Sequence, residues 1–150
     1  MKTITVSNGD IQLNNGKIQF STGSQKLVED ITRWLEEPLG TGFTSPGFGS
    51  LLWNNIGQPQ TGGSANSVQS EISRILQLYQ TQQAYSLQKA QSSSQLSNWN
   101  KSEIIKNIIS ISASVYNTAI IANVILQTLQ DEQINLTISI NNNGVSVTNG

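Results

Sequence analysis

Apolar and polar positions alternate over the first 22 residues, as they do along β-strands. Asn8-Gly9 and Asn15-Gly16 are Asn-Gly pairs, the strongest short signal for a two-residue hairpin turn. Such turns would align the apolar pairs Val6–Ile11, Ile4–Leu13, Leu13–Ile18 and Ile11–Phe20. These side chains would share one face, and Thr5, Gln12 and Gln19 would take the other. Residues 1–22 are therefore predicted to form a three-stranded β-meander.

Two later segments have helical spacing. The first follows Ser24, a suitable N-cap residue, and ends near Pro38 and Gly40. Its apolar stripe consists of Leu27, Val28, Ile31, Trp34 and Leu35. The second runs over residues 64–90, starting near Ser64 or Ser67 after a polar linker at 58–63. Its narrow stripe consists of Val68, Ile72, Ile75, Leu76, Tyr79 and Leu87. Packing against the C-terminal strands is the favoured interpretation of this stripe, and partner binding is the alternative.

From residue 104 onward the pattern predicts strands again. A two-residue turn at Asn117-Thr118 would align Val115 with Ile120, Ala113 with Ala122, Ile111 with Val124 and Ile109 with Leu126. An odd-numbered loop around Asp131-Glu132 would place Leu126 opposite Leu136, and a turn at Asn143-Gly144 would pair Ile140 with Val147. The edge of this last hairpin carries few charges, so either a partner strand or solvent can cover it. A second antiparallel β-meander is expected.

This order of elements predicts an α+β fold. It consists of an N-terminal β-meander at 1–22, followed by a domain over 23–150 that contains the two helices and the C-terminal meander. Between the helices, residues 40–57 combine five glycines and a proline with two phenylalanines and a tryptophan. Aromatic side chains on a loop with such restricted backbone geometry are typical of a docking surface or a cap over a core.

Composition narrows the possible functions. Charged residues make up only 11% of the chain and the net charge is −1, without a basic cluster, which argues against nucleic-acid binding. The chain has no Cys and no His, which removes thiolate nucleophiles, His bases and Cys/His zinc sites. The apolar-rich run at 104–129 is too polar for a membrane span, and no signal peptide is visible at the N-terminus.

The candidate catalytic and ligand motifs are weak. Glu36 and Glu37 are adjacent and point in different directions on a helix, whereas a glycosidase needs two opposed carboxylates. The glycines Gly40, Gly42 and Gly49 lack the lysine of a phosphate loop. Trp34, Trp53 and Trp99 would suit sugar stacking, but core and interface anchoring is favoured. We expect no catalytic, cofactor-binding or metal-binding residues.

Two stretches resemble a known protein family. GDIQLNNGKIQFSTGSQKLVEDITRWLEEPLG is similar to the opening of phage baseplate assembly proteins, and TSPGFGSLLWNNIG is similar to their Pro-x-Phe/Tyr-Gly-x-x-Leu box. The box is matched by Pro46, Phe48, Gly49 and Leu52. The family is that of the lysozyme-like baseplate wedge proteins of contractile tails, also called baseplate assembly protein W or sheath initiators. The resemblance covers residues 9–140. The Glu-Pro-Arg that many members carry before the meander is replaced here by residues 100–104.

The resemblance implies a structural, non-enzymatic protein of the virion. Its partners would be other baseplate wedge proteins, the tail sheath protein and, as a further candidate, the tail tube. The sheath would be templated by β-strand pairing, and Phe48 and Trp53 would anchor the loop on wedge neighbours. The expected interaction residues are Pro46, Phe48, Gly49, Leu52, Trp53, Ile138, Ile140, Val145 and Val147. The alternatives are a carbohydrate-binding module and a cell-wall hydrolase of a tail.

Overall fold

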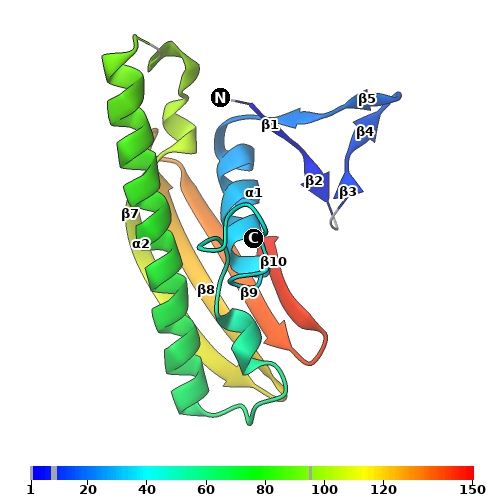
Figure 1. The fold of residues 1–150 in the computed structure, drawn as a ribbon. Helices are drawn as coiled ribbons and strands as arrows, with labels where there is room; N and C mark the ends of the chain where they lie inside the picture. The colour runs from blue at the N-terminus through cyan, green and yellow to red at the C-terminus, as the bar shows by residue number, and fades with distance from the viewer. Residues whose placement is uncertain (1, 8–9, 95) are drawn as a thin grey trace.

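The protein has an α+β fold in which two helices cover one face of an antiparallel sheet (Figure 1). The structure is a computed structural model that describes residues 2–7, 10–94 and 96–150. The sheet contains β7 (Ile105–Tyr116), β8 (Ala119–Thr128), β9 (Gln133–Asn141) and β10 (Gly144–Asn149) in the order β10-β9-β8-β7. Helix α1 (Gly23–Glu36) packs against β10, and α2 (Gly62–Ser92) packs against β7 and β8.

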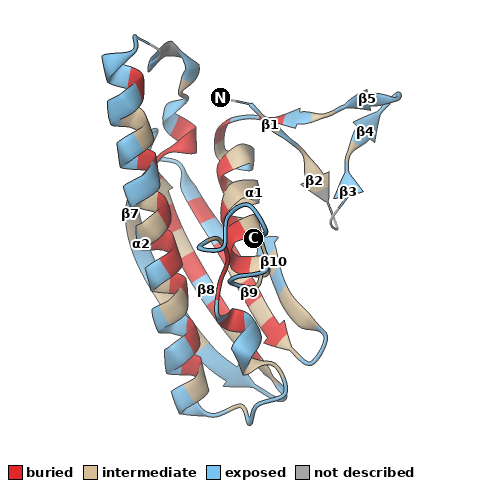
Figure 2. Cartoon of the chain, in the orientation of Figure 1, coloured by how far each residue is buried: buried red, intermediate tan, exposed pale blue. Residues whose placement is uncertain are grey.

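The core lies between the helices and the sheet, where the buried residues gather (Figure 2). The even-numbered residues of β8 and β9 point inward, because side chains alternate along a strand. Their buried members are Ile120, Ala122, Val124, Leu126, Ile134, Leu136, Ile138 and Ile140. The apolar stripes of the helices pack on this layer. Their buried members include Leu27, Ile31 and Leu35 from α1 and Val68, Ile72 and Ile75 from α2. The predicted helical stripes therefore face the core, although Val28 and Leu87 are only partly buried.

The sheet register confirms some predicted pairs and corrects others. Val115–Ile120, Ala113–Ala122 and Ile111–Val124 pair as predicted. Ile108, not Ile109, lies opposite Leu126, because a register shift between Ile108 and Ser110 leaves Ile109 unpaired and exposed. The two later turns are also shifted. Leu126 pairs with Ile134, and the observed pairs Val145–Ile140 and Val147–Ile138 place the last turn at residues 142–143. Gly144 is then the first strand residue, with φ +136°.

The N-terminal segment is a triangle and not the predicted meander. It has three separate two-stranded ladders: β1 (Thr3–Ile4) with β6 (Phe20–Ser21), β2 (Val6–Ser7) with β3 (Asp10–Ile11), and β4 (Leu13–Asn14) with β5 (Lys17–Ile18). Val6–Ile11 and Leu13–Ile18 pair as predicted, but Ile4 faces Phe20 and not Leu13, and Ile11 does not face Phe20. The ladders form the corners of a triangle in Figure 1. The predicted Asn8-Gly9 turn lies outside the described residues.

A cycle of three backbone hydrogen bonds closes this N-terminal triangle, by which we mean residues 2–7 and 10–22. Thr5 N donates to Gln19 O, Gln12 N to Thr5 O, and Gln19 N to Gln12 O, at 2.9–3.0 Å. These three residues are spaced seven apart, as are Ile4, Ile11 and Ile18. The segment is therefore a threefold repeat of a seven-residue unit, each contributing one side of the triangle.

Both helix starts differ from the predicted ones. α1 begins at Gly23, with Thr22 and not Ser24 at the N-cap, and the Thr22 side chain makes no capping hydrogen bond. Glu103 supplies the cap from 80 residues away, because its Oε1 accepts the Gly23 N–H at 3.0 Å. α2 starts at Gly62, two residues earlier than the first predicted site, because Thr61 and Ser64 form a reciprocal capping box.

Candidate functional site

The Gly/Pro/aromatic loop leaves the end of α1 and returns to it. Ser50 N donates to Glu37 O at 2.8 Å, and Leu39 N donates to Ser50 O at 3.0 Å, so the two ends of the loop pair in parallel. The Ser50 hydroxyl also donates to Leu35 O at 2.7 Å. Residues 40–49 thus form a loop whose two ends are joined by hydrogen bonds. The short helix η1 (Leu52–Asn55) follows this loop.

Gly49 is required at the base of this loop. Its φ is +108°, and a Cβ there would lie 2.7 Å from Glu37 O and 2.9 Å from Pro38 O. Both contacts are with backbone atoms, which cannot rotate away as the end of a side chain can. The glycine that matches the family box therefore has a structural reason in this chain, since it lets two backbone segments approach each other.

The aromatic residues around the loop divide between core and surface. Trp34 is buried, and Phe48 packs against it with ring centroids 4.4 Å apart. The Trp53 indole N–H donates to Glu36 O at 2.7 Å, and 36% of this residue remains exposed. The Trp53 ring also lies where a Cβ on Gly144 would be 3.3 Å away. Trp53 thus covers the start of β10 while presenting part of its ring to solvent.

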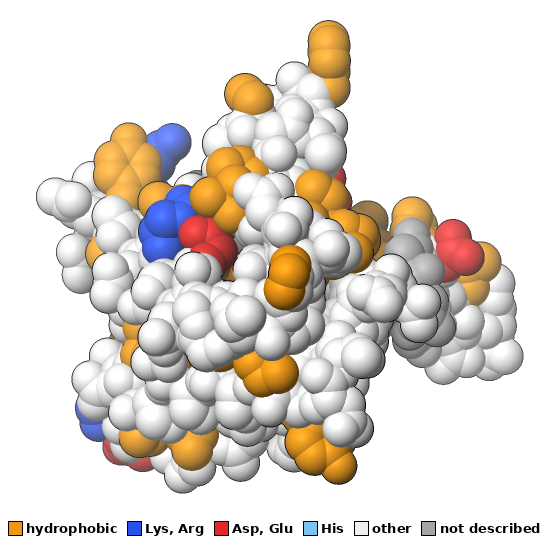
Figure 3. Space-filling model, turned by 90° about the horizontal axis from the view of Figure 1, so that it is seen from below, with side chains coloured by type: hydrophobic (Ala, Val, Ile, Leu, Met, Phe, Trp, Pro, Cys, Tyr) orange, Lys and Arg blue, Asp and Glu red, His pale blue; other side chains and the backbone are white. Residues whose placement is uncertain are grey.

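A groove of about 620 Å³ lies between this aromatic cluster, β10, α1 and the N-terminal triangle. Phe48, Trp53, Val145 and Val147 supply its apolar lining, with Val6 from the triangle. α1 and the residue that follows it add polar residues, namely Glu29, Thr32, Arg33, Glu36 and Glu37. Four of the residues expected to contact partners therefore meet in one groove. Figure 3 shows hydrophobic side chains scattered over a largely uncharged face of the molecule.

The environment of the groove shifts the pKa of Glu36. Burial raises the pKa of its carboxyl, and the hydrogen bond that Oε1 accepts from Val147 N, at 2.9 Å, opposes the rise. The same bond occupies a backbone donor at the outer edge of β10. Glu37, the residue after Glu36, accepts a hydrogen bond from the Thr41 hydroxyl at 2.7 Å. The two carboxylates thus have separate structural partners.

The remaining expected interaction residues lie elsewhere. Pro46 is exposed on the loop, and Gly49 is buried at its base. Leu52, Ile138 and Ile140 are fully buried in the core of the isolated chain. These three positions maintain the fold, whereas Phe48, Trp53, Val145 and Val147 form the groove.

The two edges of the sheet can be compared from the hydrogen-bond alternation. Gly150 N donates to Asn135 O, and Thr128 N donates to Glu132 O. In antiparallel pairing the backbone groups of successive residues point to opposite sides. With the register, these bonds show that the even-numbered residues of β8 bond to β9 and the odd-numbered ones bond to Ser110, Ser112 and Ser114 of β7. The N–H and C=O of Ile111, Ala113 and Val115 therefore point away from β8. On β10 the outward groups are those of residues 145, 147 and 149, of which Val147 N is already bonded to Glu36.

The β7 edge opens onto a second groove, which the sequence analysis did not predict. It measures about 650 Å³ and lies between β7 and α2. Ile108, Ile109, Ser110 and Ile111 line one side, and Gln69, Ser70, Ser73, Arg74 and Gln77 line the other. β7 is 12 residues long and its one charged residue is Lys106, near its start. The signal for this edge was available in the sequence, because Ser110, Ser112 and Ser114 alternate with apolar residues and residues 107–116 carry no charge.

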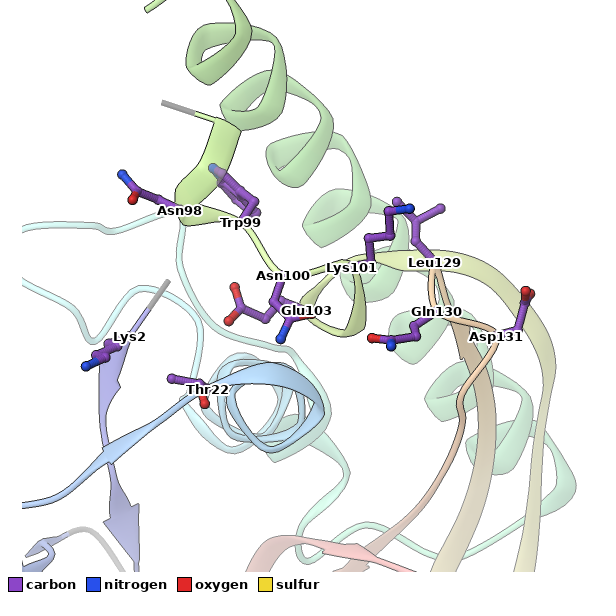
Figure 4. Close-up of a pocket in the computed structure, with 10 residues that line it drawn as sticks. All are labelled: Lys2, Thr22, Asn98, Trp99, Asn100, Lys101, Glu103, Leu129, Gln130 and Asp131. Carbon is purple, nitrogen blue, oxygen red and sulfur yellow. The ribbon is translucent and has the colours of Figure 1, made fainter. Parts of the chain in front are cut away.

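A polar cavity of about 720 Å³ lies at the N-terminal end of α1 (Figure 4). Trp99 and Leu129 are the apolar members of its lining, among Lys2, Thr22, Asn98, Asn100, Lys101, Glu103, Gln130 and Asp131. Its two acids have partners, because Glu103 caps α1 and Asp131 pairs with Lys106. Trp99 lies at this end of α1 and Trp53 at the other, with 14 residues of helix between them, so the three tryptophans do not form one surface.

In the described part of the chain, no group of three or more acidic residues has the arrangement of a metal site. None of the described helices has the length and hydropathy needed to cross a membrane. No family model, no curated protein and no solved structure matches this sequence.

Proposed function

We propose that the protein is a structural component of a contractile-tail baseplate wedge, which links the wedge to the tube and templates the first sheath ring. The motif resemblance over residues 9–140 supports the choice of this assembly. The observation that carries the mechanism is the unpaired β7 edge beside α2, because an edge strand with an adjacent groove is the arrangement that accepts an extra strand.

The physical features of β7 favour strand addition. The outward backbone groups of Ile111, Ala113 and Val115 offer three donors and three acceptors to a partner strand. The side chains of Ile111 and Ala113 are partly buried against the core, so an added strand would extend that apolar layer. Lysines, prolines and bulges protect the edges of natural sheets. In β7 these features are confined to the first half of the strand, which has Lys106 and two register shifts.

The groove lined by Phe48, Trp53, Val145 and Val147, which we call the aromatic groove, would give a second contact, to wedge neighbours. Trp53 and Phe48 present large apolar surface next to Val145 and Val147, and such buried aromatic anchors dominate interface energies. The low charge of the chain is consistent with permanent neighbours, because few ions need desolvation on docking.

A matched pair of proline variants tests which edge receives the sheath strand. Ala113→Pro removes an outward N–H on β7, and Asn149→Pro removes an outward N–H on β10, so neither breaks an internal ladder bond. Each variant is co-expressed with the sheath subunit from the same tail, and complex formation is measured by co-purification. We expect A113P to lose the complex and N149P to retain it. Retention by A113P, or loss by N149P alone, would contradict pairing at β7.

The carbohydrate-binding and hydrolase alternatives are tested separately. Tryptophan fluorescence with added glycans and turbidity of a peptidoglycan suspension are the direct assays, and the proposal predicts no change in either.

A further inference from the structure

The N-terminal triangle carries an uncovered apolar face. Its three ladders place two apolar side chains at each corner: Ile4 with Phe20, Val6 with Ile11, and Leu13 with Ile18. Side chains alternate along each strand, so all six lie on one face, and Thr5, Gln12 and Gln19 lie on the other. Exposure is 54% at Ile11, 61% at Leu13 and 58% at Phe20. A single layer of two-residue ladders with such a face needs a second layer in order to be stable in water.

We propose that this face packs against the same face of a second copy of the chain, so that two triangles stack into a two-layer core. This inference is independent of the proposed baseplate function. The three corners are nearly equivalent, because the seven-residue unit repeats three times. A face of this kind is self-complementary: a twofold axis lying between the two layers places every apolar pair over another apolar pair.

Two of the three charged side chains of the segment lie on the polar face. Asp10 pairs across its ladder with Ser7, and Lys17 with Asn14, so each lies opposite the apolar residue beside it. Stacking would therefore leave Asp10 and Lys17 in water. The third, Lys2, precedes β1 and lines the polar cavity at the N-terminal end of α1.

The triangle contacts the rest of the molecule along its β1–β2 side. There Arg33 Nη2 donates to Ile4 O at 2.8 Å, and Val6 lines the groove that also contains Phe48 and Trp53. The corner formed by β4 and β5 points away from the helices and the sheet in Figure 1. We place the twofold axis so that it exchanges this corner with the β2–β3 corner, which would put residues 23–150 of the two copies beside different sides of the stacked triangles.

The available area predicts a weak dimer. About half the surface of five large apolar side chains amounts to roughly 500 Å² per triangle, and two triangles would bury on the order of 1,000 Å², the lower limit for a specific interface. We therefore expect dissociation in the micromolar range, which makes the full chain monomeric when dilute and dimeric when concentrated.

Sedimentation velocity of the purified full chain, from roughly 1 to 500 μM, tests the proposal. We expect a concentration-dependent monomer–dimer equilibrium that Leu13→Ser and Phe20→Ser each weaken at least about tenfold. The matched control is Phe43→Ser, which removes a fully exposed aromatic side chain from the loop and should leave the equilibrium unchanged. If a serine variant changes the circular dichroism spectrum, Ile18→Thr replaces it, because threonine keeps the strand preference. A wild-type chain that stays monomeric throughout overturns the proposal. So does a dimer that is insensitive to the triangle variants or that is lost in F43S.

Discussion

Single residues fix the geometry of the aromatic loop. Gly49 allows the chain to pass against Glu37 and Pro38, and Trp53 ties the loop to the last turn of α1 through Glu36 O. Glu36 in turn holds Val147 of β10. These contacts join α1, the loop and the last strand, so the groove is built by few side chains at defined positions.

Replacing Gly49 should destabilise the whole domain. Gly49→Ala would place a Cβ within 2.7 Å of a backbone oxygen at a φ of +108°. We expect a loss of about 2–4 kcal/mol in the free energy of unfolding, measured by urea denaturation. Gly47→Ala is the matched control, since a Cβ there meets no atom within 4 Å, and it should change stability by less than about 0.5 kcal/mol. Equal effects of the two variants would refute the role given to Gly49.

The stability contribution of Glu36 should depend on pH. Because burial raises its pKa above the ordinary value of 4.5, the folded protein binds this proton more tightly than the unfolded chain does. The contribution is therefore complete below that ordinary value and is lost as the pH rises through the pKa of the folded state. Glu36→Gln retains an oxygen for the Val147 N–H but cannot ionise. Its unfolding free energy, relative to wild type, should increase between about pH 4 and pH 7. A constant difference over this range would contradict the assignment.

Trp53 should matter more for assembly than for folding. Trp53→Ala removes one hydrogen bond and a partly exposed ring, at a cost of about 1–3 kcal/mol, which most domains tolerate. We expect the isolated variant to keep its circular dichroism spectrum while its incorporation into baseplate wedges falls. Unfolding of the isolated variant would show that Trp53 acts as a core residue.

At the scale of elements, the two edges of the sheet differ in what covers them. Glu36 accepts a hydrogen bond from an outward donor of β10, and α1 packs along that strand, whereas β7 faces a groove beside α2.

The apolar stripes of the helices and the register at the turn between β7 and β8 were predictable, because each depends on local periodicity or on one turn. The last turn was not, because Asn142, Asn143 and Gly144 offer two adjacent turn positions, and only pairing with β9 selects residues 142–143.

The hydrogen-bond alternation of β7 can be checked by its effect on stability. Ala113→Pro removes an outward N–H, so it should cost less than about 1 kcal/mol. Ser112→Pro removes a donor that points toward Asn123 of β8, and it should cost about 3 kcal/mol or more. Thermal unfolding of the two variants measures the difference. A larger loss in A113P than in S112P would reverse the assigned alternation and place the free donors on the other residues.

At the scale of the whole molecule, long-range contacts decided what the sequence alone could not predict. Glu103 caps α1 across 80 residues, which no local pattern reveals. The N-terminal triangle was missed for a different reason. Two consecutive Asn-Gly turns are compatible with both a meander and a closed triangle, and the seven-residue repeat of Ile4, Ile11 and Ile18 favours the closed form. That repeat was visible in the sequence.

Part of the candidate site could be predicted from the sequence. Phe48, Trp53, Val145 and Val147 were predicted as interaction residues and meet in one groove, although 92 residues separate Trp53 from Val145 in the numbering. Leu52, Ile138 and Ile140 were predicted with them and are core residues, because the inward face of β9 and the start of η1 close the hydrophobic layer.

We propose that the chain belongs to a contractile-tail baseplate. Antibody-labelled electron microscopy of tailed particles, purified from the source that encodes the protein, can locate it. We expect label at the baseplate end of the tail, next to the first sheath ring. Unlabelled particles, with the protein recovered free in the lysate, would contradict it.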